Sequence, residues 1–347
     1  MDIKELVNIL SNNLPANYEG VSFYDFAKNK LEEYVTLLSA TDKNEFDNLL
    51  EATGDLGLNK NKTQRRFVNL IKVINQTCLK ILQLAYKGDM YNAISTLSKL
   101  MTVSKATKGY LADRYLSYLK FAADDGRIYY RYLKLDSNIE PKNCNHLPYN
   151  LRYLASPNRF NQIGFPCLYV ASSLDIAEKE SNCKESNCKE SNCKESNCKE
   201  SDCKESKHVY VGEFKSKKNL YYLNFCIPTK EEREKMTAYE TFEYLVTYPL
   251  LLLSLITKSN KDCTGFCEEY LFSQLFFHLL FTTKRDDIVY WDGIRYTSTL
   301  DRNGYNIVVP ASYKQQEPPS GDTISDFIEE RFKQIRQYKK GTMVAQQ

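Results

Sequence analysis

Residues 159–173 read RFNQIGFPCLYVASS, and this stretch decides how the rest of the sequence is interpreted. Gly164 and Pro166 are turn-forming residues, because glycine tolerates unusual backbone angles and proline fixes one of them. The apolar and aromatic run at 167–171 that follows is typical of a buried strand. The stretch therefore predicts a tight turn that brings Arg159, before it, and Tyr169, after it, to one rim.

On the N-terminal side, residues 1–123 have apolar positions at three- and four-residue spacing, which predicts a helical bundle. The pattern changes at 124–126 to short β-prone runs. These runs mix with helical segments between 230 and 281 without strict alternation, so the sequence favours an α+β fold over a doubly wound sheet. We expect strands at 127–133, 167–171, 208–214, 219–223, 288–290 and 305–309.

A chain of 347 residues is longer than one ordinary core, which indicates two domains. We expect a helical bundle at 1–123 and a mixed α+β domain at 124–315. Residues 316–347 are expected to form a linker and a C-terminal helix, because 323–340 has helical spacing after a Pro/Gly-rich segment.

The pentad Lys-Glu-Ser-Asn-Cys starts at Lys179 and recurs through Cys203, so that residues 179–206 form a low-complexity insertion. The segment has no large apolar residue, and five residues match neither the helical period nor the strand period. We interpret it as a tandem duplication that forms a solvated loop or a weak helix.

The 47 basic and 44 acidic side chains give a formal charge of +3, which is too balanced to favour nucleic acid as a partner. No apolar run reaches the roughly 20 residues that a membrane-spanning helix needs. No signal peptide is evident, so we expect a cytoplasmic protein with free thiols. Cysteines five residues apart do not match zinc-site spacing, and no metal is expected.

The stretch at 159–173 resembles the signature of the RES family. In that family an Arg-aromatic-Asn leads through Gly-x-Pro into a strand that carries Tyr, and then into a helix that bears Glu. Glu180 lies eleven residues after Tyr169, as the family pattern requires. Tyr130-Arg131-Tyr132 is similar to the family's opening strand, and 292–298 is similar to its closing segment, which ends at Ser298. The resemblance covers the second half of the chain and none of the helical part.

The resemblance implies a fold similar to that of ADP-ribosyltransferase toxins. It also implies an enzyme that cleaves the nicotinamide–ribose bond of NAD with phosphate or water, as the toxin of a toxin–antitoxin pair. NAD would be the substrate, with inorganic phosphate as a co-substrate, and no separate cofactor is expected. The partner implied is an antitoxin protein. Apart from the resemblance, the helical domain is expected to position the enzyme, to form a homodimer or to receive an inhibitor.

Breaking this bond leaves positive charge on the ribose, and the substrate carries a pyrophosphate. Arginine offers a planar fork of donors that matches phosphate oxygens, so Arg131 and Arg159 are candidates for holding the dinucleotide. Tyr132 or Tyr169 could stack on nicotinamide or adenine. We therefore assign Arg159 and Tyr169 to the catalytic set, and Arg131 and Tyr132 to substrate binding.

A carboxylate near the anomeric carbon stabilises charge that develops only in the transition state. Glu180 is the candidate for this role. Glu205 is its rival, because it directly precedes the strand beginning near His208, as the motif without the insertion would. Ser298 is expected to hydrogen-bond the substrate, since no Ser-His-Asp arrangement is evident.

Two other functions remain open. An ADP-ribosyltransferase on the same scaffold would move ADP-ribose onto a macromolecule, and a non-catalytic interaction protein could have a site that the insertion disrupts. Products formed from labelled NAD distinguish these alternatives.

Overall fold

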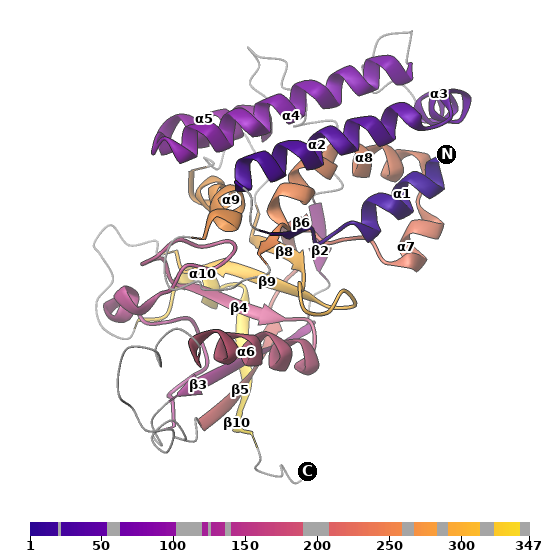
Figure 1. Ribbon diagram of the computed structural model, residues 1–347. Coiled ribbons are helices and arrows are strands. Elements are labelled where there is room, and N and C mark those ends of the chain that lie inside the picture. Colours follow the sequence, from indigo (N-terminus) through magenta and orange to yellow (C-terminus); the bar gives the residue numbers. More distant parts are fainter. Residues whose placement is uncertain are drawn as a thin grey trace. The chain divides into compact units, whose positions relative to one another are not determined.

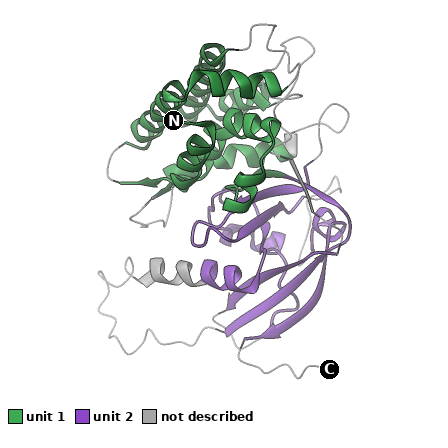
Figure 2. Cartoon of the chain, turned by 90° about the vertical axis from the view of Figure 1, so that its right-hand side faces the viewer, with its two compact units in different colours: residues 1–121, 223–260, 267–290 green, residues 122–222, 261–266, 291–347 purple. Residues whose placement is uncertain are grey.

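The computed structural model describes residues 1–19, 22–53, 63–101, 120–123, 126–135, 140–189, 208–258, 267–282, 291–312 and 323–340. The chain is α+β, as the sequence predicts, with its elements in the order shown in Figure 1. It forms two compact units (Figure 2). Unit 1 comprises residues 1–121, 223–260 and 267–290, and unit 2 comprises residues 122–222, 261–266 and 291–347.

Unit 1 is helical. Its first helix begins at the N-cap Asp2, and its second begins at Ser22, whose hydroxyl accepts a hydrogen bond from the Asp25 N–H, as expected of an N-cap. A two-residue strand pair joins β1 (Asn17–Tyr18) to β7 (Thr257–Lys258). The helices are α1 (Ile3–Asn12), α2 (Phe23–Ala40), α3 (Lys43–Ala52), α4 (Gln64–Tyr86), α5 (Met90–Met101), α7 (Lys230–Lys235), α8 (Ala238–Ser254), η2 (Glu268–Tyr270) and α9 (Leu271–Thr282).

The helices between 230 and 282 belong to unit 1, whereas the sequence-based boundaries placed them in the 124–315 domain. Helix α8 is buried along nearly its whole length, because its residues are apolar on all sides. The Phe242 ring on α8 lies 5.4 Å from the Phe67 ring on α4, and Tyr244 hydrogen-bonds Ser11 on α1 at 2.9 Å. Periodicity shows that such a helix needs partners all round, but it does not say which elements provide them.

Unit 2 is built on a sheet with the strand order β10-β5-β3-β4-β9-β8, which continues through β6 and β2 at the joins between the units. The registered pairs within β10-β5-β3-β4-β9-β8 are antiparallel. The strands are β2 (Lys120–Ala123), β3 (Ile128–Leu135), β4 (Cys167–Ala171), β5 (His208–Ser216), β6 (Leu220–Phe225), β8 (Gly293–Thr297), β9 (Tyr305–Pro310) and β10 (Phe332–Lys339). The expected strands at 127–133, 167–171, 208–214, 219–223 and 305–309 are confirmed, and 288–290 lies outside the described residues.

Three helical elements accompany this sheet: η1 (Tyr149–Leu154), α6 (Leu174–Lys189) and α10 (Asp326–Glu329). Helix α6 contacts β3 and β4 (Figure 1), where Ile176 and Ala177 pack on Ala171 together with Tyr130 and Tyr132. The helix continues into the first pentads of the insertion, as a weak helix would.

The expected C-terminal helix is replaced by the short α10 and the strand β10. Strand β10 pairs antiparallel with β5 over almost its whole length. Without it, β5 would present a row of unpaired backbone groups at the edge of the sheet. Helical spacing in this tail is outweighed by these backbone hydrogen bonds, which only the tertiary structure provides.

His146 links the segment before η1 to the segment before α10. Its ring is buried, its Nε2 accepts a hydrogen bond from the Ser325 N–H at 2.9 Å, and its Nδ1 lies 2.7 Å from the Leu147 carbonyl oxygen. Burial lowers the pKa of His146 from 6.5 to about 4. The native protein therefore holds this ring neutral.

We expect unit 2 to lose stability as the pH falls from 6.5 towards 4. In this range the unfolded chain binds a proton at His146 that the native state does not, and the loss would reach about 3 kcal/mol at the lower end. Burial also lowers the pKa of His278 in unit 1. Urea unfolding of wild type and His146→Gln at several pH values isolates the contribution of His146, and parallel curves for the two proteins would contradict it.

Candidate active site

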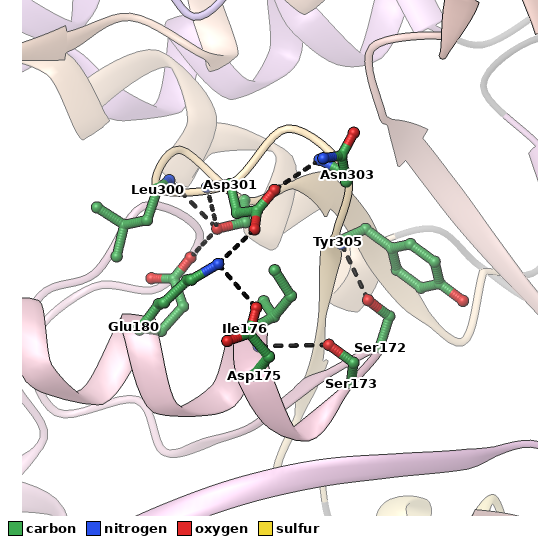
Figure 3. A network of polar contacts seen from close by, with 11 residues as sticks. Ser172, Ser173, Asp175, Ile176, Glu180, Leu300, Asp301, Asn303 and Tyr305 are labelled. Atoms are coloured by element: carbon green, nitrogen blue, oxygen red, sulfur yellow. Dashed lines mark hydrogen bonds and ion pairs between the residues drawn. The ribbon is translucent and has the colours of Figure 1, made fainter. Parts of the chain in front are cut away.

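Glu180 lies on α6, two turns after the strand-to-helix junction at Ser172 and Ser173. The Ser173 hydroxyl accepts a hydrogen bond from the Ile176 N–H at 3.3 Å, which helps to begin the helix. Ser172 joins the same junction to β9, because its hydroxyl accepts from the Tyr305 N–H at 3.1 Å (Figure 3). The start of α6 is thereby attached to the strand that faces Glu180.

The Glu180 carboxylate meets two side-chain donors, one directly after β8 and one in β9. Its Oε1 accepts from the Ser298 hydroxyl at 2.7 Å and from Asn306 Nδ2 at 2.8 Å. Ser298 and Asn306 are both buried. Within the described residues no hydrogen bond is made to Oε2, which points away from this network in Figure 3. The carboxylate is thus held through Oε1, and Oε2 accepts no hydrogen bond from the described residues.

Ser298 organises the turn between β8 and β9. Besides donating to Glu180, its hydroxyl accepts from the backbone N–H groups of Leu300 at 3.2 Å and Asp301 at 3.3 Å. The one proton of the hydroxyl is directed at the carboxylate. This arrangement suits a residue that orients Glu180, and it differs from the expected direct contact between Ser298 and the substrate.

The register of the strands shows which other residues share the face of Asn306. Asn306 lies opposite Ala171 on β4 and opposite Tyr296 on β8, and Tyr169 lies opposite Val308. Since alternate residues of a strand point to the same face, Tyr169, Ala171, Tyr296 and Asn306 lie on one side of the sheet. We call this side the Glu180 face.

The predicted loop before β4 is also on the Glu180 face. The Phe160 ring packs 4.9 Å from the Tyr296 ring, and the Tyr169 hydroxyl donates to Asn161 Oδ1 at 2.7 Å. Arg159 is buried in this loop, with 7% of its surface exposed. Gly164 has a φ of 80°, a backbone angle that glycine adopts without strain, as the expected turn requires. Tyr169 and Glu180 therefore belong to the same side of the sheet, and the loop that carries Arg159 packs there through Phe160 and Asn161.

Tyr132 is also on the Glu180 face but is engaged with other side chains. Its hydroxyl donates to Glu178 Oε2 at 3.3 Å, and the ammonium of Lys340, which pairs with Glu178, lies 5.4 Å from its ring centre. Burial and the Glu178 carboxylate raise the pKa of Tyr132 to about 12. Its ring packs against the cluster under α6 rather than standing open for a base.

Arg131 is on the opposite face, contrary to the expectation that it joins Arg159 at one dinucleotide. It lies between Tyr130 and Tyr132 in the strand and opposite Gly212, where a side chain would collide with Cys144. Burial lowers the pKa of the guanidinium, and among the described residues its Nη1 has no hydrogen-bond partner. A single strand cannot direct adjacent residues to one face, so Arg131 and Tyr132 could not both serve the same site.

Glu205, the rival candidate for the catalytic carboxylate, lies outside the described residues. Of the two glutamates, the structure therefore gives contacts for Glu180. Asn306 is the member of the site that sequence reasoning did not assign. The signal for it was weak, because an Asn at the beginning of an apolar strand is also typical of a turn. Only the pairing of β9 with β4 brings it under α6.

No family model matches this chain, and no curated protein matches it. A solved chain from the Mycobacterium tuberculosis MbcT–MbcA toxin–antitoxin complex aligns with 63% of this chain and 86% of its own length. The identity is 11% and the TM-score is 0.29. A likeness this weak carries no argument about function.

The helices in the described part of the chain are too short or too polar to cross a lipid bilayer. Over the same residues, no three His, Cys, Asp or Glu side chains gather as metal ligands would.

Proposed function

We propose that this protein is a RES-type enzyme that cleaves the bond between nicotinamide and ribose in NAD and passes the ADP-ribosyl group to phosphate or water. The observation that supports the proposal is the Glu180 carboxylate, whose Oε1 is fixed by Ser298 and Asn306 while Oε2 is unoccupied by any described residue. The resemblance of 159–173 to the RES signature is its second support.

In the proposed reaction the bond from the ribose C1′ to the pyridinium nitrogen breaks, and its electron pair leaves with neutral nicotinamide. Positive charge then develops at C1′ and the ring oxygen. A carboxylate oxygen held nearby stabilises this charge, and preorganisation is effective because the donors are already oriented before the reaction. Phosphate or water forms the new C1′–O bond, and the proton lost by the attacking group passes to Glu180 or to solvent.

The other residues have supporting roles in this proposal. Arg159, buried in the loop on the Glu180 face, would bind a phosphate of the dinucleotide, since a guanidinium donates two parallel hydrogen bonds to phosphate oxygens. Tyr169 would define the pocket beside it, with its hydroxyl fixed by Asn161. Arg131 is left out of the Glu180 face and has no assigned part in the reaction.

The test is to incubate purified protein with NAD labelled in its adenine ring, with and without inorganic phosphate. Free ADP-ribose or its 1″-phosphate, formed together with one equivalent of nicotinamide, is the expected result. Label retained on protein or nucleic acid would indicate an ADP-ribosyltransferase instead. A folded protein that consumes no NAD in either buffer would end the proposal and favour a non-catalytic interaction protein.

An inhibitory protein partner is part of the proposal only through the family resemblance, since an enzyme that depletes NAD needs restraint. Co-purification with a candidate antitoxin, together with loss of NAD cleavage in the complex, tests it. Size-exclusion chromatography with light scattering tests the expected homodimer.

A further inference from the structure

Lys179, the residue immediately before Glu180, contacts the turn that lies between the two donors to Glu180, Ser298 and Asn306. Its ammonium lies 2.6 Å from Asp301 Oδ2 in the turn between β8 and β9, and 2.7 Å from Asp175 Oδ2 one helical turn earlier (Figure 3). Two adjacent residues of α6 therefore contact this part of the chain: the Lys179 ammonium pairs with Asp301, and the Glu180 carboxylate accepts from Ser298. We call the Lys179–Asp301 ion pair the clamp.

Asp301 is central to the shape of this turn. Its Oδ1 accepts from the Asn303 N–H at 2.9 Å, its carbonyl oxygen accepts from the Gly304 N–H at 3.1 Å, and its own N–H reaches Ser298 Oγ. Ser298 comes directly before the turn and Asn306 follows shortly after it. A displacement of Asp301 would therefore move both donors of the Glu180 carboxylate.

The turn also fits closely against α6. A Cβ atom at Gly304 would come within 2.3 Å of the Ile176 side chain, so any larger residue there would force that side chain to move. The contact between Gly304 and Ile176 limits the distance between the turn and the helix. The clamp fixes its position along the helix, which packing against one isoleucine leaves free.

The clamp contributes little to global stability. The side chains of Lys179 and Asp301 are 43% and 21% exposed, and exposed ion pairs in proteins contribute weakly to folding. The pKa of Lys179 is raised by the carboxylates of Asp175 and Asp301, and Lys179 lowers the pKa of Asp301. Both directions favour the charged forms that make the ion pair.

We propose that Lys179 and Asp301 are positioning residues of the active site, which hold the β8–β9 turn in register with α6 so that Ser298 and Asn306 reach Glu180 Oε1. The inference rests on the proposed function for its kinetic consequence. It concerns the first Lys-Glu pair of the insertion, Lys179-Glu180, whose contacts with this part of the chain the structure describes.

The kinetic test uses Lys179→Ala and Asp301→Ala in the full chain. We expect kcat for NAD cleavage to fall about tenfold in each while KM changes little, because a misplaced carboxylate weakens stabilisation of the transition state. Lys179→Arg, which keeps the cation, should restore most of kcat. The matched control is Lys30→Ala, which removes an exposed 2.7 Å ion pair with Glu33 in unit 1 and should leave kcat unchanged.

Backbone amide exchange provides a readout that does not need activity. The N–H groups of Leu300 and Asp301 are bonded to Ser298 Oγ, and both should exchange faster in Lys179→Ala than in wild type or Lys30→Ala. If wild type cleaves no NAD, the proposed function fails, and faster exchange at these two amides alone still supports the clamp. The clamp is overturned if the two amides exchange at the wild-type rate in Lys179→Ala. It is also overturned if kcat of Lys179→Arg is as low as kcat of Lys179→Ala.

Discussion

Replacement of Glu180 by glutamine is expected to lower NAD cleavage by about 10²- to 10³-fold, whereas Glu205→Gln leaves it nearly unchanged. Glutamine has the size of glutamate and keeps one oxygen that can accept from Ser298 and Asn306. It loses the negative charge that the proposed mechanism places near the ribose. The initial rate of nicotinamide release, measured with saturating NAD, reports the difference.

Glu205→Gln is a stringent control, because Lys-Glu-Ser surrounds both glutamates and the two substitutions are chemically identical. An active Glu180→Gln enzyme together with an inactive Glu205→Gln enzyme would reverse the assignment. The insertion would then carry the functional glutamate at its end. Equal activity of both variants and wild type would remove both Glu180 and Glu205 from the mechanism.

The second large effect is expected at the buried ion pair between Arg331 and Asp292. Arg331 Nε lies 2.6 Å from Asp292 Oδ1, and both side chains are almost fully buried. Asp292 Oδ2 also accepts from the Tyr221 N–H at 2.8 Å, and Arg331 Nη1 donates to the Phe327 carbonyl at 2.9 Å. The pair thus connects the segment before β10 to the beginning of β8.

Arg331→Met should lower the free energy of unfolding by about 3–5 kcal/mol, because it leaves a carboxylate buried without its counterion. Urea unfolding can be followed by the fluorescence of Trp291, the single tryptophan, which is buried beside Asp292. Lys30→Met, which breaks an exposed ion pair of similar length, should cost at most about 1 kcal/mol. A comparable small loss in both variants would contradict a stabilising role for the buried pair.

This prediction also bears on the site. Asp292 precedes β8, and β8 leads directly into Ser298. If Arg331→Met shifts the start of β8, NAD cleavage should decrease together with stability. Activity that remains at the wild-type level in the folded variant would show that the clamp and the packing of the turn are sufficient to place Ser298.

Local signals predicted the elements near the site well. The run at 167–171 becomes β4 with the expected bounds, and Gly164 adopts the positive φ that the turn requires. Residues 3–101 contain α1 to α5, as the spacing of apolar residues predicts. In each case the structure depends on residues a few positions apart, which a sequence displays directly.

The position of Arg131 follows from the alternation of side chains along β3, which the sequence already contains. A strand directs alternate residues to opposite faces, so Tyr132 on the Glu180 face excludes Arg131 from it. The resemblance of the Tyr-Arg-Tyr run to the family motif favoured both residues for one site. The period of the strand allows only one of them.

The sequence by itself determined the α+β class, the helical N-terminal part and the strand at 167–171, and its resemblance to the RES signature made Glu180 the candidate through its spacing from Tyr169. Pairing over long distances decided the rest: β10 forms a strand because β5 has an open edge, and α8 lies in unit 1 because α3, α4 and α9 pack against it. Asn306 and Asp301 meet α6 only after β9 pairs with β4. The physical reason is that periodicity records which side of an element is buried, whereas the partner of that side depends on contacts between residues more than a hundred positions apart.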